Sequence, residues 1–352
     1  MNAPFALAGE YVREADLRQP DEAARIEGFV AGMRGTLFHR PAWLCAVERG
    51  TGQRAIGLVA EKRGQVTGWL PLSEVHSPVF GRALVSSGFA VGGGILTESN
   101  RTVLALTGAA QELASRHSCA SVELRGGVIP THWAVRSDSH CGFVASLAGD
   151  DEAQLTAIPR KQRAEVRKGL DGELTVSVGR DNAERAAHYA VYAESVRNLG
   201  TPVFPRALFD AALDALDSNI LTVRHRGKPV ASVLSFYHDG AVMPYWGGGT
   251  YEARALRANE RMYFELMLHA RRRGCETFDF GRSKTGGGPY NYKKNWGFEP
   301  EPLTYASWTA PGTEARDADP TSAKHAARIA IWKRLPLPLA NALGPHIARG
   351  LG

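Results

Sequence analysis

Residues 278–297 are the most informative part of the chain, and they read Phe278-Asp279-Phe280-Gly281-Arg282-Ser283-Lys284-Thr285-Gly286-Gly287-Gly288-Pro289-Tyr290-Asn291-Tyr292-Lys293-Lys294-Asn295-Trp296-Gly297. The stretch begins with an alternating apolar strand, passes through three glycines and a proline, and ends in aromatic and lysine residues. Glycine lets a backbone approach a ligand closely, and arginine and lysine donate hydrogen bonds to phosphate or carboxylate. The pattern indicates an anion-binding site or, alternatively, an exposed loop with solvated lysines.

The strand that opens this stretch has a counterpart earlier in the chain, which indicates an internal repeat. Residues 114–125 match residues 270–281, and Gly92-Gly93-Gly94 matches Gly247-Gly248-Gly249. Two predicted hairpins, at 55–72 and 220–236, also correspond, and each follows an aromatic and arginine entry to a helix. Four matches in the same order predict a duplicated α+β domain.

The repeat sets the predicted domain organisation. We expect an N-terminal domain at residues 1–155, a C-terminal domain at 156–308, and a linker and amphipathic tail at 309–352. The segment 310–323 has the composition of a linker, and residues 324–349 combine apolar with basic side chains. Such a tail can lie on an anionic membrane, but its three prolines make docking against the body an equal alternative.

The densest basic cluster lies between the two repeats. Pro159 can begin a helix and Gly169 can end it, and five cations fall within residues 160–168. We expect Lys161, Arg163 and Arg167 to hold phosphates, although such a face is often only solvated.

Composition restricts the class of protein. The chain has 352 residues, 44% of them hydrophobic and 22% charged, with a formal charge of +6, which is typical of a globular protein whose basic surface permits anionic partners. The sequence contains no stretch of 18 apolar residues and no secretory leader pattern, so we expect a cytoplasmic protein. Its four scattered cysteines indicate reduced thiols, and we expect no metal site.

Taken together, these features resemble the FemAB-type acyltransferases, which are built from two GNAT-like domains, and in particular the subgroup associated with exosortase (XrtA) and PEP-CTERM systems. The resemblance covers residues 36–305. It is carried by residues 38–44, 68–72, 79–86, 92–94, 159–168, 278–297 and 303–305.

The resemblance implies transfer of an acyl or aminoacyl group to an amine, in cell-envelope or exopolysaccharide biosynthesis. The acceptor would be a small or lipid-linked anionic molecule, and the donor an aminoacyl-tRNA or an acyl-CoA. GNAT domains that bind CoA carry R/Q-x-x-G-x-G/A, whereas residues 254–260 contain no glycine, so the donor stays unresolved and no tightly bound cofactor is expected.

Lys293 matches the family's aromatic-lysine motif and is the first candidate for a catalytic residue, because an ammonium can neutralise a phosphate or an oxyanion. Asp279 could orient Arg282 or act as a base, or it could be a plain surface group. We expect the remaining substrate-binding residues to be Arg282, Ser283, Tyr245, Trp246, Gly247, Tyr290 and Tyr292, with packing in the core an equal alternative for Tyr245 and Trp246.

The first repeat lacks a counterpart of the lysine pair and its aromatics, so we expect it to act as a scaffold. A second class of function, a catalytically silent module that binds an anionic polymer or tRNA in the same cleft, fits the same residues.

Overall fold

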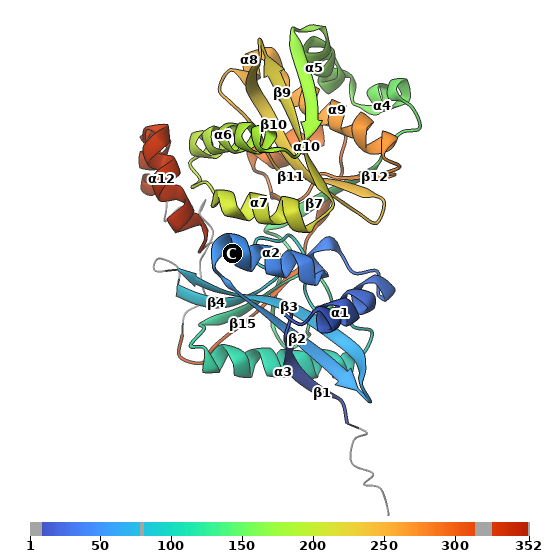
Figure 1. Cartoon of the computed structure of the whole chain (residues 1–352), viewed down its shortest axis with the longest axis vertical. Coiled ribbons are helices and arrows are strands. Elements are labelled where there is room, and N and C mark those ends of the chain that lie inside the picture. The colour runs from blue at the N-terminus through green and yellow to red at the C-terminus, as the bar shows by residue number, and fades with distance from the viewer. Residues whose placement is uncertain (1–8, 78–80, 314–325, 351–352) are drawn as a thin grey trace, which may run out of the picture.

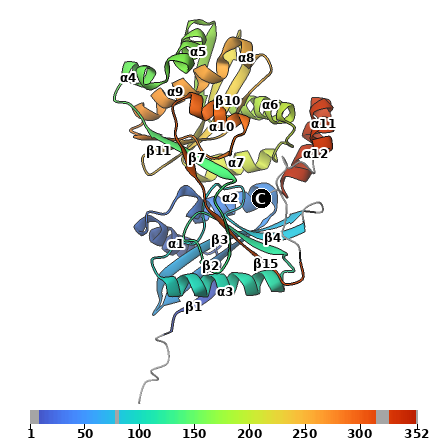
Figure 2. The same ribbon diagram turned by 180° about the vertical axis from the view of Figure 1, so that it is seen from behind.

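The computed structural model describes residues 9–77, 81–313 and 326–350. The chain forms two lobes, each a mixed sheet with helices on both faces (Figures 1 and 2). Most neighbouring strands are antiparallel, but one pair in each lobe is parallel, β4 with β5 and β11 with β12.

The first sheet has the strand order β1-β2-β3-β4-β5-β15-β6 among the described residues. Helix α3 covers one face, while α1 and α2 cover the other (Figure 1). The elements of this lobe are β1 (Tyr11–Ala15), α1 (Pro20–Gly32), the short helix Leu37–His39, α2 (Pro41–Thr51), β2 (Arg54–Lys62), β3 (Gln65–Ser77), β4 (Gly81–Ser86), α3 (Asn100–Arg116), β5 (Ser121–Arg125), β6 (Ala134–Arg136) and β15 (Tyr305–Thr309).

The second sheet has the order β13-β7-β12-β11-β10-β9-β8, and β14 also pairs with β7. Its elements are β7 (His140–Ser146), α4 (Asp151–Ala157), α5 (Arg160–Asp171), β8 (Leu174–Gly179), α6 (Asn182–Leu199), α7 (Arg206–Ala215), β9 (Ser218–His225), β10 (Lys228–His238), β11 (Ala241–Gly249), α8 (Ala253–Leu256), α9 (Ala258–Arg272), β12 (Thr277–Asp279), β13 (Ser283–Lys284), α10 (Gly288–Asn295) and β14 (Pro300–Pro302).

The element order confirms the predicted duplication. The first lobe runs α2-β2-β3-β4-α3-β5, and the second runs α7-β9-β10-β11, then α9 and β12. The glycine triplets serve close packing: a Cβ at Gly94 would lie 2.0 Å from the Gly126 carbonyl oxygen, and one at Gly248 would lie 2.3 Å from the Ser195 hydroxyl. These glycines are needed because other parts of the chain lie against them.

The two lobes exchange a strand. After β6 the chain crosses to the second sheet, where β7 pairs with β12, and after β14 it returns, so that β15 pairs with β5 and β6 (Figure 2). The predicted boundary between residues 155 and 156 therefore does not separate the sheets. It was wrong because a strand that leaves its own repeat to pair with the other gives no signal in local composition.

Helices that correspond in the repeat pack against each other across the lobes. Helix α7 lies directly on α2 (Figure 1), and a Cβ at Gly50 would lie 2.3 Å from the Leu208 Cα. One apolar cluster joins Trp43 of α2 with Phe209 of α7 and Trp246 of β11. The lobes therefore share a core.

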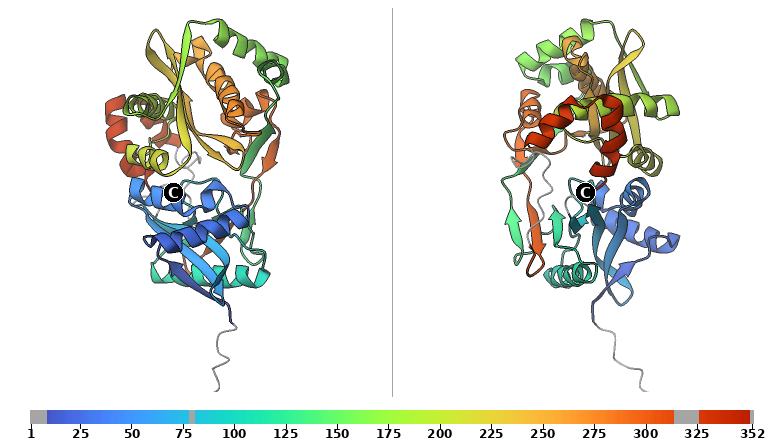
Figure 3. Two further views of the ribbon diagram at one scale, coloured as in Figure 1. Left: turned by 45° about the vertical axis from the view of Figure 1, so that its right-hand side comes forward. Right: turned by 90° about the vertical axis from the view of Figure 1, so that its left-hand side faces the viewer.

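The tail forms α11 (Ala326–Arg334) and α12 (Leu337–Ala348), which pack beside α6 (Figure 3). The Gln53 side-chain amide donates to the Arg349 carbonyl oxygen at 2.9 Å, which ties the end of the tail to the first lobe. The tail thus docks on the body, the alternative left open by the sequence. Most of the predicted linker, residues 314–323, lies outside the described residues, and no described helix is long and apolar enough to cross a membrane.

Candidate functional site

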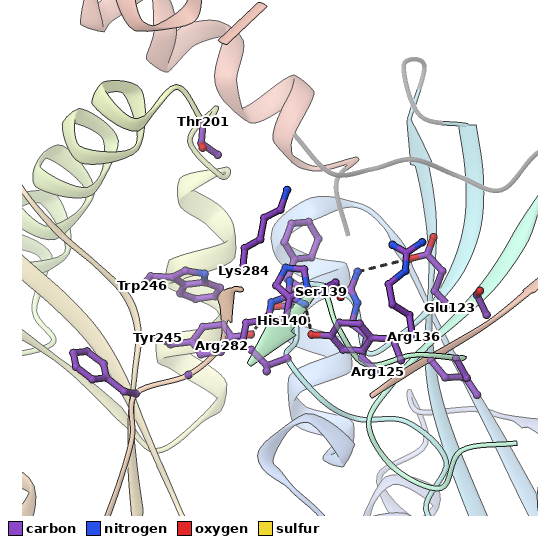
Figure 4. Close-up of a pocket in the computed structure, with 18 of the residues that line it drawn as sticks. Glu123, Arg125, Arg136, Ser139, His140, Thr201, Tyr245, Trp246, Arg282 and Lys284 are labelled. Atoms are coloured by element: carbon purple, nitrogen blue, oxygen red, sulfur yellow. Dashed lines mark hydrogen bonds and ion pairs between the residues drawn. The ribbon is translucent and has the colours of Figure 1, made fainter. Parts of the chain in front are cut away.

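A pocket of about 700 Å³ opens between the lobes, and its walls come from both of them (Figure 4). The first lobe contributes the end of β5 together with β6 and β15. The second lobe contributes β11, the loop after β12, and one residue of α10. The strand exchange brings these ends together, because it places β15 beside β5 and β7 beside β12.

Arg125, at the end of β5, is the more buried of the two arginines that the first lobe contributes to the pocket, Arg125 and Arg136. Its guanidinium donates to the Ala90 carbonyl oxygen at 3.2 Å and lies 3.9 Å from the Glu123 carboxylate. Burial and the nearby charge of Arg282 lower the pKa of Arg125 to about 10, so it is still protonated at neutral pH.

Arg282 reaches the pocket from the second lobe. It donates to the Tyr305 hydroxyl at 3.2 Å, so it lies against the strand that the first sheet received by exchange. Arg136, His140 and Lys284 also line the pocket, and Figure 4 shows the cationic side chains around one opening. A concave surface with several cations and a single carboxylate, Glu123, suits an anionic molecule.

Lys293 is buried on the second-lobe side of this pocket, with 8% of its surface exposed. Its Nζ donates to the carbonyl oxygens of Gly281 and Arg282, both at 3.0 Å. Burial lowers its pKa to about 8, while Asp279 acts in the opposite direction. Two of the three N–H donors of the Lys293 ammonium therefore hold the side chain in position, and the third N–H makes neither of these bonds.

Asp279 lies behind this wall rather than in it. Its carboxylate accepts the Gly281 N–H at 2.9 Å, and burial raises its pKa. Gly281 has φ 71°, a left-handed conformation that glycine adopts without strain. Asp279 therefore holds the turn whose carbonyl group receives Lys293, and it does not itself line the pocket.

The aromatic residues divide into two groups. Tyr245, Trp246 and Gly247 line the pocket, and the Tyr245 hydroxyl donates to the Phe89 carbonyl oxygen at 2.6 Å. Tyr290 and Tyr292, also expected to bind substrate, do not line this pocket. Tyr290 packs on Phe143 with 5.4 Å between ring centroids, and Tyr292 packs near Tyr263 at 6.1 Å.

The basic segment forms a helix, α5, as predicted, but none of its residues lines the pocket. Arg163 donates to the carbonyl oxygens of Ile158 (3.0 Å) and Thr156 (2.7 Å), so it closes the end of α4. Lys161 and Arg167 are exposed. Ser283, also expected to bind substrate, is buried in β13 and pairs with Cys141 of β7.

Sequence reasoning missed the first-lobe residues of this pocket, namely Glu123, Arg125, Arg136 and Tyr305, and also His140 of β7. The first repeat, expected to act as a scaffold, contributes side chains to the wall of this pocket. One available signal was the repeat itself, because Glu123 corresponds to Asp279 and each acidic residue is followed within three positions by an arginine.

Comparison with known proteins shows what this arrangement resembles. Residues 159–294 match the family described as acetyltransferase (GNAT) domain. These residues form a GNAT acyltransferase domain. A search of the curated proteins gives no match to this sequence.

Solved structures support a tandem GNAT fold over most of the chain. FemX is 15% identical, with a TM-score of 0.62 over 82% of this chain and 96% of its own. A tandem GNAT protein from the clavulanic acid biosynthesis pathway is 11% identical, with a TM-score of 0.59 over 87% of this chain and 100% of its own. The C-terminal domain of a putative lysylphosphatidylglycerol synthetase from Agrobacterium fabrum is 13% identical, with a TM-score of 0.54 over 83% of this chain and 93% of its own.

The domain match and the tandem fold confirm the predicted fold class and the assignment as an acyltransferase. Among residues 9–77, 81–313 and 326–350, no group of three or more His, Cys, Asp or Glu side chains could hold a metal ion.

Proposed function

We propose that the protein transfers an acyl or aminoacyl group to the amine of an anionic acceptor bound between the lobes. One observation carries this proposal: the buried Lys293 shares a pocket with Arg125 and Arg282, which come from different lobes. Two arginines hold the acceptor's negative charge, and a lysine fixed by two carbonyl groups presents an ammonium to the reacting centre.

In this reaction the acceptor nitrogen forms a bond to the acyl carbon, and the bond from that carbon to the donor's oxygen or sulfur breaks. The proton lost by the amine leaves with the donor's leaving group or with solvent. The carbonyl oxygen becomes negative in the transition state, and a fixed ammonium stabilises that charge. Lys293 supplies the charge, and Asp279 keeps the Gly281 turn in place for it.

The N-terminus of α9 favours a donor other than CoA. In GNAT domains that bind CoA, glycine-rich backbone at this junction holds the pyrophosphate. Here α9 begins after Arg257, whose φ is 54°, and its first turn contains Glu260. A side-chain carboxyl group in this place opposes a second anion, so the proposal favours an aminoacyl-tRNA, as the resemblance to the FemAB type also suggests.

The acceptor we propose is a cell-envelope precursor, small or lipid-linked, and the setting is a cytoplasmic, exosortase- and PEP-CTERM-associated or exopolysaccharide pathway. This part of the proposal is supported by the sequence resemblance and by the anionic preference of the pocket.

Mass spectrometry of ligands that co-purify with the full chain tests the proposal. We expect to find a phosphorylated or carboxylated amine among these ligands. In a reconstituted reaction, we expect an aminoacyl group to be transferred to this amine from a charged tRNA. Recovery of a CoA ester that serves as donor would contradict the donor assignment. Tight binding of the amine without turnover from either donor would instead favour the binding module.

A further inference from the structure

Helix α12 leaves two of its leucines exposed although it docks on the body of the protein. Its small residues Ala340, Gly344 and Ala348, spaced by four, are buried against the body. Leu339 and Leu343 lie on another face of the helix and are 46% and 45% exposed. A helix held by the hydrophobic effect alone buries its leucines, so this arrangement leaves apolar area for another partner.

Helix α11 extends the same surface. Ile331 is 64% exposed, although Ile329 of the same helix lies against Gly200 of the body. Leu199, at the end of α6 and next to that contact, is 59% exposed. We call Leu199, Ile331, Leu339 and Leu343 the tail surface.

Charge identifies the partner's chemistry. Residues 320–352 contain five lysines and arginines and neither aspartate nor glutamate. Lys333 and Arg334 end α11 and are exposed, and the stem of Lys333 lies against Gly200 together with Ile329. Exposed leucine and isoleucine together with cations, and no acidic residue in the segment, match the interface of an anionic bilayer, where apolar side chains enter the acyl boundary and cations contact lipid phosphates.

The buried face of α12 lies close to the pocket. A Cβ at Gly344 would lie 3.0 Å from the Val203 side chain, and Phe204 and Thr201, on either side of Val203 in the sequence, line the pocket. Figure 4 shows a tail helix near Thr201. A protein held by the tail surface would have its pocket close to the membrane.

We propose that α11 and α12 form a docking surface for an anionic membrane, with Leu339, Leu343 and Ile331 entering the bilayer and Lys333 and Arg334 contacting lipid phosphates. The binding itself is independent of the proposed function; only its use, delivery of a lipid-linked acceptor, depends on that function.

Co-sedimentation of the full chain with vesicles tests this proposal. We expect binding to vesicles of phosphatidylglycerol and phosphatidylcholine, and at least tenfold weaker binding to phosphatidylcholine alone or in high salt. The triple variant Ile331→Ser, Leu339→Ser, Leu343→Ser should bind the anionic vesicles at least tenfold more weakly than wild type. Leu104→Ser is the matched control, because Leu104 is 60% exposed on α3 of the other lobe.

Unchanged vesicle binding by the triple variant would overturn the proposal, as would a loss of the same size in Leu104→Ser. Sedimentation velocity of wild type and triple variant without vesicles tests the other occupant. A wild-type dimer that the triple variant abolishes would assign the tail surface to a second copy of the chain and would also overturn the proposal.

Discussion

Arg125 and Arg282 reach the same pocket from opposite lobes, and the charge of Arg282 is one of the causes that lower the pKa of Arg125 to about 10. Two like charges in one pocket repel each other, and burial adds to the unfavourable free energy of the pair. A bound anion would relieve that repulsion. The structure thus keeps two cations where an anionic acceptor would stabilise both.

Replacing either arginine should weaken acceptor binding more than turnover. A hydrogen bond to a charged group contributes about 1.5–3 kcal/mol, so Arg282→Gln should raise the acceptor KM by about 10- to 100-fold, with a smaller change in kcat. Arg125→Lys keeps the charge and should have a weaker effect than Arg125→Gln. Steady-state kinetics check this, with Arg116→Gln on α3 as a control that leaves KM unchanged. Equal KM values for all four variants would refute the anion assignment.

The pH dependence of turnover should follow Lys293. Its ammonium form is present below its folded pKa of about 8, and the proposed role needs that form. The rate at saturating substrate should therefore fall as pH rises through about 8, and Lys293→Met should lack this limb. A rate that instead increases across this range because of Lys293 would show that the neutral amine acts as a base.

The contact between α2 and α7 should be intolerant of added volume. A Cβ at Gly50 would lie 2.3 Å from the backbone Cα of Leu208, which cannot move aside as a side chain can. Gly50→Ala should lower the free energy of unfolding by about 1–3 kcal/mol through overpacking.

Gly28→Ala is the matched control, because Gly28 is also helical but a Cβ there would meet no atom within 4 Å. That variant should raise the free energy of unfolding by about 0.5–1 kcal/mol. Denaturant unfolding distinguishes the two, and a stable Gly50→Ala protein would contradict the packing described.

Acid should destabilise the second lobe through His188. This side chain bonds Ser232 at 3.0 Å, and burial lowers its pKa to about 3, below the ordinary value of 6.5. Below pH 6.5 the unfolded chain binds a proton that the folded chain does not. The stability contributed by the neutral form is therefore lost as pH falls from 6.5 towards 3, by up to about 1.4 kcal/mol per pH unit.

His188→Leu should reduce this slope, measured as the free energy of unfolding between pH 7 and 4. Burial also lowers the pKa of His39 to about 4, so part of the pH dependence of stability should remain in this variant. An identical slope in wild type and variant would show that His188 does not carry the effect.

The sequence predicted the fold well wherever contacts are local or repeated. The hairpins that turn at Gly64 and Gly227 and the glycine triplets recur in order, and each lobe has the expected elements. The exchange of β7 and β15 could not be predicted, because it depends on which sheet edge is open in three dimensions. The alternation of apolar and polar residues along a strand is the same whichever sheet the strand joins.

The site was predictable only on one side. Lys293 and Arg282 line the pocket and lie in one continuous stretch, residues 278–297, while Tyr245 lines it from the strand that ends in the second glycine triplet. Arg125 was missed because it reaches Arg282 across the lobe interface, and residues that belong to different repeats have no fixed spacing in sequence. Tyr290 and Lys161 were expected to bind substrate because of their residue types. In the structure Tyr290 packs on Phe143 and Lys161 is exposed to solvent, and neither lines the pocket.

The most direct test of the account compares Lys293→Met with Lys294→Met, an exposed neighbour on the same helix. Turnover of the identified acceptor and the acceptor dissociation constant are measured for both. We predict that Lys293→Met lowers kcat by at least about 100-fold, as for loss of a donor to a developing oxyanion, while acceptor affinity stays within about threefold of wild type. Equal kcat values in the two variants would contradict a catalytic role for Lys293.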